Sequence, residues 1–266
     1  MIWINGEPET RINANDRAVQ FGDGCFTTAR LIDGEVVALD QHIERLSQTC
    51  QRLLIERVDW HALRQEMILV SRGQEEGVLK VILSRGAGGR GYSATGCGNP
   101  TRMLSLSPYP GRYHQLRQTG ARLALSPVRL SRNPLLAGIK HLNRLEQVLI
   151  RTQLEQTGAD EALVLDTEGM LVECCAANLF WRKGGDVFTP DLSDSGVNGI
   201  QRQRVIRLLH EQGITVKEVR VPPETLAGAD EVVITNALMP TLPVYQIEDW
   251  RWSSRQLFEL IRLQDN

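Results

Sequence analysis

The order of short strand-like and helix-like segments is the feature of this sequence that most limits its fold. Alternation of apolar and polar residues predicts strands at 2–5, 26–32 and 36–39, with Asp33-Gly34 as a hairpin turn. A helix over 41–54, capped by Asp40, and a second over 60–71 follow from 3.6-residue periodicity. Strands at 78–84 and 102–107 complete the first half.

The second half mixes strands and helices without a regular alternation. Strands are predicted over 121–126, 161–166, from 172 onward, 178–182, 186–189, 215–221 and 231–235. Helices are predicted over 143–156, 200–212 and, briefly, 223–227. Because hairpins are frequent and the helices are irregularly spaced, the sequence predicts an α+β or mixed α/β fold rather than a doubly wound parallel sheet.

Two prolines and a glycine interrupt the chain near its middle, in Pro108-Tyr-Pro-Gly-Arg112. We therefore expect a smaller N-terminal α/β domain over residues 1–107, a linker over 108–118 and a larger C-terminal domain over 119–266. Ligand sites are common where two domains meet, so the site is expected in the cleft between them.

Composition argues against several classes of protein. A formal net charge of −2 gives no footprint for nucleic acid or an anionic membrane. No apolar run approaches the roughly 18 residues of a membrane span, and the N-terminus lacks the features of a signal peptide. Five cysteines, without a Cys-x-x-Cys, and five scattered histidines argue against a disulfide framework and a metal site. We expect a cytoplasmic protein with no metal, nucleic acid or membrane among its partners.

Lysine is rare in this chain, and Lys140 has an unusual setting. The other three, Lys80, Lys183 and Lys217, lie in alternating strands or a turn, where an ammonium can reach solvent. Lys140 ends the apolar run Leu135-Leu-Ala-Gly-Ile-Lys140, just before a predicted helix. Such a lysine either extends its ammonium to solvent or is held desolvated, which lowers its pKa and makes the amine reactive.

A reactive lysine can carry an aldehyde cofactor if two further groups are present. One is a carboxylate that keeps the cofactor ring nitrogen protonated, and the other is a cradle for its phosphate. Glu173, within the apolar run Leu171-Val-Glu-Cys-Cys-Ala-Ala, is the candidate carboxylate. A buried acid must be paired, and a pyridinium or an arginine within the fold would serve equally well.

Three segments could bind the phosphate. Arg45 lies beside His42 on the first predicted helix, although a solvated helix arginine is the ordinary alternative. Gly196-Val-Asn-Gly-Ile-Gln-Arg202 is a glycine-bearing turn that leads into a helix, whose free N–H groups attract anions. Thr235-Asn236 ends a predicted strand.

A glycine-rich loop, Arg85-Gly-Ala-Gly-Gly-Arg-Gly-Tyr92, could contact the substrate. The loop lacks the Lys-Ser/Thr of a nucleotide-binding loop, and no helix follows it. Arg90 or Tyr92 could grip a substrate carboxylate, and a flexible surface turn is the alternative.

Taken together, these segments resemble the fold-type IV pyridoxal phosphate enzymes of the class IV aminotransferase family. The similarity runs in order through nearly the whole chain and rests on Gln20-Phe-Gly-Asp-Gly24 with Phe26, His42-Ile-Glu-Arg-Leu46, Lys140-His-Leu-Asn143, Glu173 with Ala177-Asn-Leu-Phe180, Asn198-Gly-Ile200, Ala229-Asp-Glu231 and Pro243-Val244. The segments around Thr28, Lys140 and Glu173 are most similar to the aminodeoxychorismate lyase branch of this family.

The resemblance implies a homodimer of two-domain subunits with pyridoxal 5'-phosphate in the interdomain cleft. It assigns the covalent bond to the cofactor and the proton transfer to Lys140, and the ring nitrogen to Glu173. Phosphate binding is assigned to Arg45, to the amides around Gly199, Ile200 and Gln201, and to Thr235-Asn236. Thr28 becomes a candidate proton donor, and Arg90 and Tyr92 would face substrate carboxylates.

Three positions depart from the pattern of the family. Arg144 stands where transaminases have a tyrosine that meets the cofactor hydroxyl, and Gln201 replaces a small hydroxyl residue. Near Ala237 a phosphate-binding threonine of some relatives is missing. Lys140, Glu173 and Arg45 themselves lie in segments that match the pattern of the family.

The lyase resemblance implies conversion of 4-amino-4-deoxychorismate to 4-aminobenzoate and pyruvate, as in folate biosynthesis. A branched-chain or D-amino-acid transaminase of the same fold is the main alternative. Thr28 argues against it, because branched-chain transaminases usually have glycine at this position. A cofactor-binding protein without activity is a further alternative, which would leave Thr28, Arg90 and Tyr92 unexplained.

Overall fold

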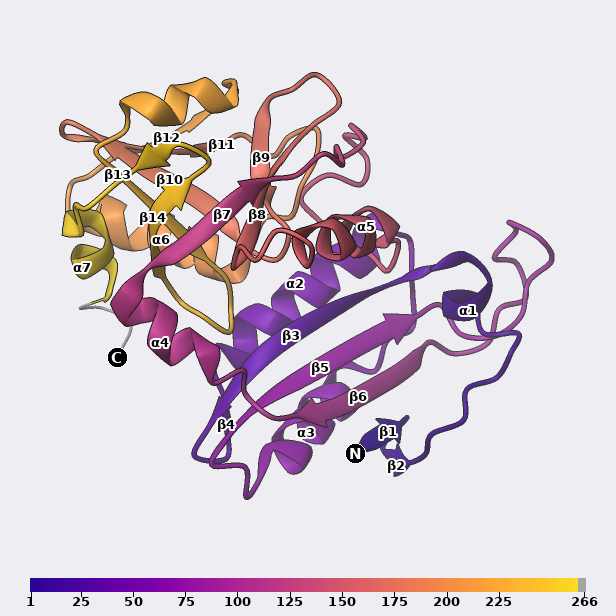
Figure 1. The fold of residues 1–266 in the computed structure, drawn as a ribbon. Helices are drawn as coiled ribbons and strands as arrows, with labels where there is room; N and C mark the ends of the chain where they lie inside the picture. The colour runs from indigo at the N-terminus through magenta and orange to yellow at the C-terminus, as the bar shows by residue number, and fades with distance from the viewer. Residues whose placement is uncertain (263–266) are drawn as a thin grey trace. The chain divides into compact units, whose positions relative to one another are not determined.

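The computed structural model describes residues 1–262, which form two compact units (Figure 1). The first unit comprises Met1–Tyr109 together with Ile139–Asn143. The second comprises Pro110–Gly138 and the chain from Arg144 onward. The short segment Ile139–Asn143 therefore leaves the second half of the sequence and joins the first unit.

The first unit contains a six-stranded sheet in the order β2-β1-β6-β5-β3-β4. Every neighbouring pair in it is antiparallel. Its strands are β1 (Ile2–Ile4), β2 (Glu7–Pro8), β3 (Gly24–Ile32), β4 (Glu35–Val36), β5 (Glu76–Ser84) and β6 (Thr101–Ser107). Three helices accompany it: α1 (Arg17–Phe21), α2 (Leu39–Arg52) and α3 (Trp60–Ser71).

Successive side chains of strand β3 point to opposite faces of this sheet. Cys25, Thr27, Ala29 and Leu31 are buried, whereas Phe26, Thr28 and Arg30, between them, are only half-buried. The buried face packs with α2 and α3 in a core that includes Leu46, Leu63, Met67 and Leu83. The other face of β3 therefore carries the side chains that are not enclosed in this core.

The second unit is built on a nine-stranded mixed sheet in the order β12-β11-β10-β13-β14-β7-β8-β9, with β15 paired to β14. Its strands are β7 (Ala121–Leu125), β8 (Glu161–Leu165), β9 (Leu171–Cys174), β10 (Asn178–Lys183), β11 (Asp186–Pro190), β12 (Val216–Val219), β13 (Glu231–Thr235), β14 (Leu242–Ile247) and β15 (Trp250–Arg251). Three pairs, β11 with β12, β14 with β7 and β7 with β8, are parallel.

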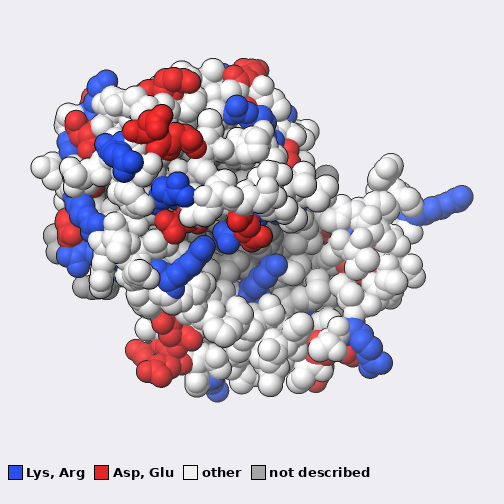
Figure 2. All heavy atoms as spheres, in the orientation of Figure 1, with Lys and Arg blue, Asp and Glu red and all other residues white. Residues whose placement is uncertain are grey.

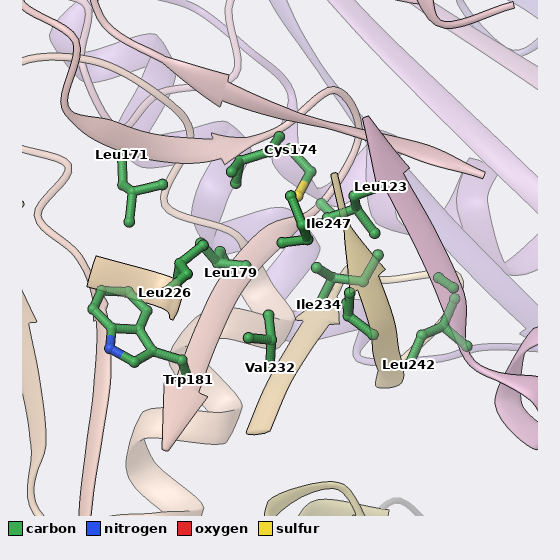
Figure 3. Close-up of a cluster of buried hydrophobic side chains, with 14 of the residues drawn as sticks. Leu123, Leu171, Cys174, Leu179, Trp181, Leu226, Val232, Ile234, Leu242 and Ile247 are labelled. Atoms are coloured by element: carbon green, nitrogen blue, oxygen red, sulfur yellow. The ribbon is translucent and has the colours of Figure 1, made fainter. Parts of the chain in front are cut away.

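Helices and three apolar cores complete the second unit. The helices are α4 (Arg112–Thr119), α5 (Leu145–Leu154), α6 (Ile200–Glu211), the 3₁₀ helix η1 (Pro223–Gly228) and α7 (Gln256–Arg262). Figure 3 shows the larger core, in which Trp181, Leu179 and Ile234 from adjacent strands converge with Leu226 of η1. A second core joins α6 and α7 to the sheet through Phe180, Leu209 and Phe258.

The predicted fold class is confirmed, since both sheets are rich in antiparallel pairs and neither is doubly wound. Several local predictions are wrong. Helix α2 begins at Leu39, so the strand predicted over 36–39 is cut to Glu35–Val36. Asp40 is not its cap: the N-cap residue is Ala38, in a left-handed conformation with φ of 57°, and Asp40 instead accepts a bond from Arg64.

The ends of other elements also differ from expectation. Leu54, predicted as the last residue of the helix over 41–54, lies beyond the end of α2 at Arg52, with φ of 56°, and is largely exposed. Helix α4 occupies the stretch for which the sequence predicts a linker. The domain boundaries drawn from the sequence, 1–107 and 119–266, stay a prediction.

Charges of both signs are interspersed on the molecular face in Figure 2, in keeping with the net charge of −2. Among the described helices, none is both long enough and apolar enough to cross a membrane.

Candidate active site

Lys140 belongs to the first unit because its backbone is bonded to β3. The amide of Phe26 donates to the Lys140 carbonyl oxygen at 3.0 Å, and the Leu142 amide donates to the Gly24 carbonyl at 3.0 Å. The Asn143 side chain donates to the Gly22 carbonyl at 3.2 Å. These bonds fix the lysine segment alongside the start of β3.

The side chain of Lys140 lies over the half-buried face of β3. Its Nζ is 4.7 Å from the centroid of the Phe26 ring, a cation–π geometry. Thr28 lies two residues farther along the strand and so shares this face with Phe26. The predicted amine and the predicted proton donor therefore belong to one surface of the same unit.

Lys80 is a neighbour that the sequence does not reveal. It pairs with Thr28 across β3 and β5, and its Nζ is 5.2 Å from the same Phe26 ring. The alternating pattern predicts only that Lys80 reaches solvent, which it does. Its closeness to Phe26 follows from the strand register, which no signal in the sequence specifies.

Arg45, on α2, is hydrogen-bonded to the face of the sheet that α2 covers. Its Nη2 donates to the hydroxyl oxygen of Thr27, which lies 2.6 Å from His42 Nδ1. Burial, with a smaller contribution from the Arg45 charge, lowers the pKa of His42 to about 3. The ring next to Arg45 is therefore neutral at physiological pH.

The loop with Arg90 and Tyr92 has a fixed backbone and exposed side chains. Buried Arg17 donates to the carbonyl oxygens of Gly91, Tyr92 and Ser93 at 3.1–3.3 Å. The Tyr92 side chain is exposed, with its ring 5.6 Å from that of Phe21. Arg90 and Tyr92, which are predicted to bind substrate, therefore extend from a loop whose backbone is bound by the Arg17 guanidinium.

Asp23 links this loop to the rest of the first unit. Its carboxylate accepts bonds from Arg17 Nε and Arg85 Nε, both at 2.7 Å. Burial opposes ionisation of Asp23, but the hydrogen bonds from Arg85 and Arg17 outweigh it, and its pKa lies below the usual value of 3.8. A charged carboxylate with two guanidinium partners therefore holds the base of the loop.

Glu173 lies on β9 in the second unit and is 5% exposed. Its Oε2 accepts a bond from the Val197 amide at 2.8 Å. Burial lowers the pKa of Arg144, while the negative charges of Glu173 and Glu146 oppose this. The charges of Glu173 and Arg144 therefore interact within the second unit.

The turn before α6 is attached to the same region of the second unit. Asn178 Nδ2 donates to the Val197 carbonyl oxygen at 2.8 Å, so Glu173 and Asn178 together satisfy both backbone groups of Val197. Gly199 is the N-cap residue of α6, and no side chain caps this helix start. Ile200 and Gln201, which follow, are buried. Such a helix start offers backbone N–H groups to an anion.

Thr235 and Asn236 have structural roles in their own turn. The Thr235 hydroxyl donates to the Pro240 carbonyl, and Asn236 Oδ1 accepts from the amides of Leu238 and Met239 at 2.8 Å. Thr235 also pairs with Asn178 across β13 and β10, which places the end of β13 next to the residue that binds the Val197 carbonyl in the turn before α6.

Each unit, taken by itself, carries groups of the kinds that pyridoxal 5'-phosphate chemistry uses. The first unit provides an amine, a guanidinium and a hydroxyl in Lys140, Arg45 and Thr28. The second provides a buried carboxylate in Glu173 and an uncapped helix start at Gly199. Within residues 1–262, no group of three His, Cys, Asp or Glu side chains could hold a metal ion.

Comparison with known proteins agrees with this chemistry. The model of the family described as amino-transferase class IV matches residues 24–247. An aminodeoxychorismate lyase from Vibrio harveyi is 36% identical over 92% of this chain and 90% of its own length. A crystal structure of 4-amino-4-deoxychorismate lyase from Pseudomonas aeruginosa superposes with a TM-score of 0.94, at 36% identity, covering 99% of this chain and 97% of the other. A protein from Methanocaldococcus jannaschii, described as a putative branched-chain-amino-acid aminotransferase, is 32% identical over 98% of this chain and 92% of its own length.

Proposed function

The chain belongs to the class IV aminotransferase family, whose members use pyridoxal phosphate, and we propose that it is an aminodeoxychorismate lyase. In this proposal it converts 4-amino-4-deoxychorismate to 4-aminobenzoate and pyruvate and so serves folate biosynthesis. The lyases from Vibrio harveyi and Pseudomonas aeruginosa, each 36% identical over nearly the whole chain, support this choice within the family.

The observation that carries the proposal is the shared face of Lys140 and Thr28. An elimination needs a base that removes a proton and an acid that returns one to the departing group. Lys140 Nζ lies 4.7 Å from the Phe26 ring, and Thr28 shares the side of β3 to which this ring belongs. A hydroxyl on the same face as the amine supplies a second proton-transfer group, which a simple transamination does not need.

In the proposed site, each residue has one task toward the cofactor. Pyridoxal 5'-phosphate, when bound, supplies an aldehyde that bonds reversibly to amines and a ring that withdraws electrons from the carbon bearing the amine. Lys140 holds the aldehyde, and Glu173 keeps the ring nitrogen protonated. Arg45, the amides around Gly199, Ile200 and Gln201, and the strand end at Thr235-Asn236 bind the phosphate.

The same residues then act on the substrate. The amine of Lys140 would remove the proton from C4 of the substrate. The electron pair of the broken C4–H bond forms the last double bond of the aromatic ring, and the C3–O bond breaks so that enolpyruvate leaves with that bond's electrons. Thr28 or Lys140 protonates its methylene carbon to give pyruvate. Arg90, Tyr92 and Lys80 would orient the two substrate carboxylates through charge and hydrogen bonding.

The test is to supply purified protein with 4-amino-4-deoxychorismate, generated from chorismate and glutamine by its synthase. We expect pyruvate and 4-aminobenzoate in equal amounts. Lys140→Ala should lose turnover and the visible absorbance of bound cofactor, because the amine that holds it is gone. A Lys140→Ala protein with full activity would refute the proposal.

A transaminase remains the second candidate function, because the Methanocaldococcus jannaschii relative is 32% identical over nearly the whole chain. A branched-chain or D-amino-acid transaminase would convert bound cofactor to its amine form when an amino acid is added. It would also release a keto acid and make no 4-aminobenzoate from the lyase substrate. These results would support the transaminase instead of the lyase.

We further propose that the enzyme is a homodimer and acts in the cytoplasm. Leu145, Val148 and Leu149 expose an apolar face of α5, being 72%, 57% and 49% exposed, and a second copy of the chain would cover such a face. All five cysteines are free, as a reducing compartment requires. A monomeric mass in sedimentation at micromolar concentration would refute the dimer, and recovery of the tagged protein outside the cytoplasmic fraction would refute the location.

A further inference from the structure

Thr27 and Thr28 are adjacent in sequence and face opposite sides of β3. Thr28 shares the half-buried face with Phe26, whereas Thr27 is completely buried against α2. There, its hydroxyl oxygen lies 2.6 Å from His42 Nδ1 and accepts a bond from Arg45 Nη2. His42 and Arg45 are three residues apart on α2, so a single hydroxyl of the sheet contacts two consecutive sites on one helix face.

The direction of these hydrogen bonds follows from the chemistry of the groups. A guanidinium has no acceptor, so Arg45 donates and Thr27 accepts. His42 Nδ1, 2.6 Å away, is then the acceptor for the Thr27 hydroxyl proton. The His42 ring has a lowered pKa, caused by burial and then by the Arg45 charge, and is neutral, so Nδ1 can accept.

We propose that Thr27 and His42 are positioning residues that hold the Arg45 guanidinium in the orientation required to bind the cofactor phosphate. One N–H group fixed on Thr27 sets the plane in which the other N–H groups of the guanidinium point. Neutral His42 in turn fixes the Thr27 hydroxyl. This inference rests on the proposed role of Arg45 in phosphate binding, and it adds two buried residues that do not themselves touch the cofactor.

The binding of two cofactor forms isolates this effect. Dissociation constants of pyridoxal 5'-phosphate and of pyridoxal, which lacks the phosphate, are measured by absorbance for the full-length protein freed of cofactor. Thr27→Val keeps the shape but removes the hydroxyl. We expect it to raise the dissociation constant of pyridoxal 5'-phosphate about 10-fold, the size of one lost charged hydrogen bond, and that of pyridoxal less than about 2-fold.

Matched variants separate positioning from general damage. Thr27→Ser keeps the hydroxyl and should bind both forms as the unmodified protein does. Thr49→Val is the control, because Thr49 is also a buried hydroxyl on α2 but donates to the Arg45 backbone carbonyl at 2.7 Å. It should leave the ratio of the two dissociation constants unchanged. Unchanged pyridoxal binding in Thr27→Val serves as its folding check.

The outcomes distinguish this inference from the proposed function. If Arg45→Gln weakens binding of pyridoxal 5'-phosphate selectively and Thr27→Val does not, Arg45 binds the phosphate and the positioning role is refuted. If Arg45→Gln leaves the ratio unchanged, the proposed phosphate role of Arg45 is itself wrong. If Thr27→Val weakens both forms equally, Thr27 is only structural. Selective loss in both single variants, with no further loss when they are combined, supports the positioning role.

Discussion

Gly199→Ala tests how the second unit builds the turn before α6. The backbone at Gly199, with φ of −63° and ψ of 146°, suits alanine, so any effect has to be steric. An added Cβ would lie 2.2 Å from Asn178 Oδ1, and the oxygen has to move. Asn178 is buried, and such a movement breaks its 2.8 Å bond to the Val197 carbonyl. Leaving this carbonyl without a partner should lower the free energy of unfolding by about 1–3 kcal/mol.

The assay is urea unfolding of the protein without cofactor, so that cofactor affinity does not contribute to the measured stability. Gly185→Ala is the control, since nothing lies within 4 Å of the position of its Cβ. It should change stability by less than about 1 kcal/mol. In an Asn178→Ala background, Gly199→Ala should cost less than about 0.5 kcal/mol, because the obstructing oxygen is gone. An equal loss in both backgrounds would refute the steric reasoning.

The remaining predictions concern pH. Asp23→Asn should lower the free energy of unfolding at pH 7 by about 2–3 kcal/mol, because Arg17 and Arg85 lose a charged partner. Since the folded-state pKa of Asp23 lies below its usual 3.8, its contribution is present above that value and disappears as the pH falls through the folded pKa. The variant should therefore lose less stability than the unmodified protein below about pH 4, and equal losses would contradict the ion pair. The pKa of His42 is lowered from 6.5 to about 3, so the unfolded chain takes up the proton first and stability falls as the pH drops below 6.5. His42→Asn should remove up to about 1.4 kcal/mol per pH unit of this slope, measured by unfolding between pH 6.5 and 4; an unchanged slope would contradict a neutral buried His42.

Much of the fold could be predicted from local pattern, and the failures have physical reasons. Helix α3 has the predicted bounds, 60–71, because Asp59 caps it and an apolar stripe faces the core. Strand β14 was not predictable, because it contains Pro243. Proline has no N–H group to donate to a neighbouring strand and usually indicates the end of a strand. Helix α4 has no buried residue, so its sequence lacks the apolar periodicity from which a helix is predicted.

Candidate site residues can be recognised in the sequence where a side chain is chemically unusual for its surroundings. Lys140 ends an apolar run and Glu173 lies inside another, and both features are visible without a structure. Thr27 and Thr28 are identical, adjacent residues, and their surroundings differ because α2 packs on one face of β3 only. Thr27 is buried against this helix, and Thr28 lies on the other face. Lys80 likewise acquires its place beside Phe26 from strand register alone.

Each unit therefore prepares its part of the proposed cofactor site through backbone attachment. In the first unit, β3 carries both attachments: Phe26 bonds to the Lys140 carbonyl, and the next residue, Thr27, bonds to Arg45. In the second unit, Val197 has the same function, because its amide binds Glu173 and its carbonyl binds Asn178. A shift of either backbone segment would move the groups proposed for the reactive end and for the phosphate end together. Coupling of this kind keeps the spacing between these groups constant within a unit, which a cofactor of fixed length requires.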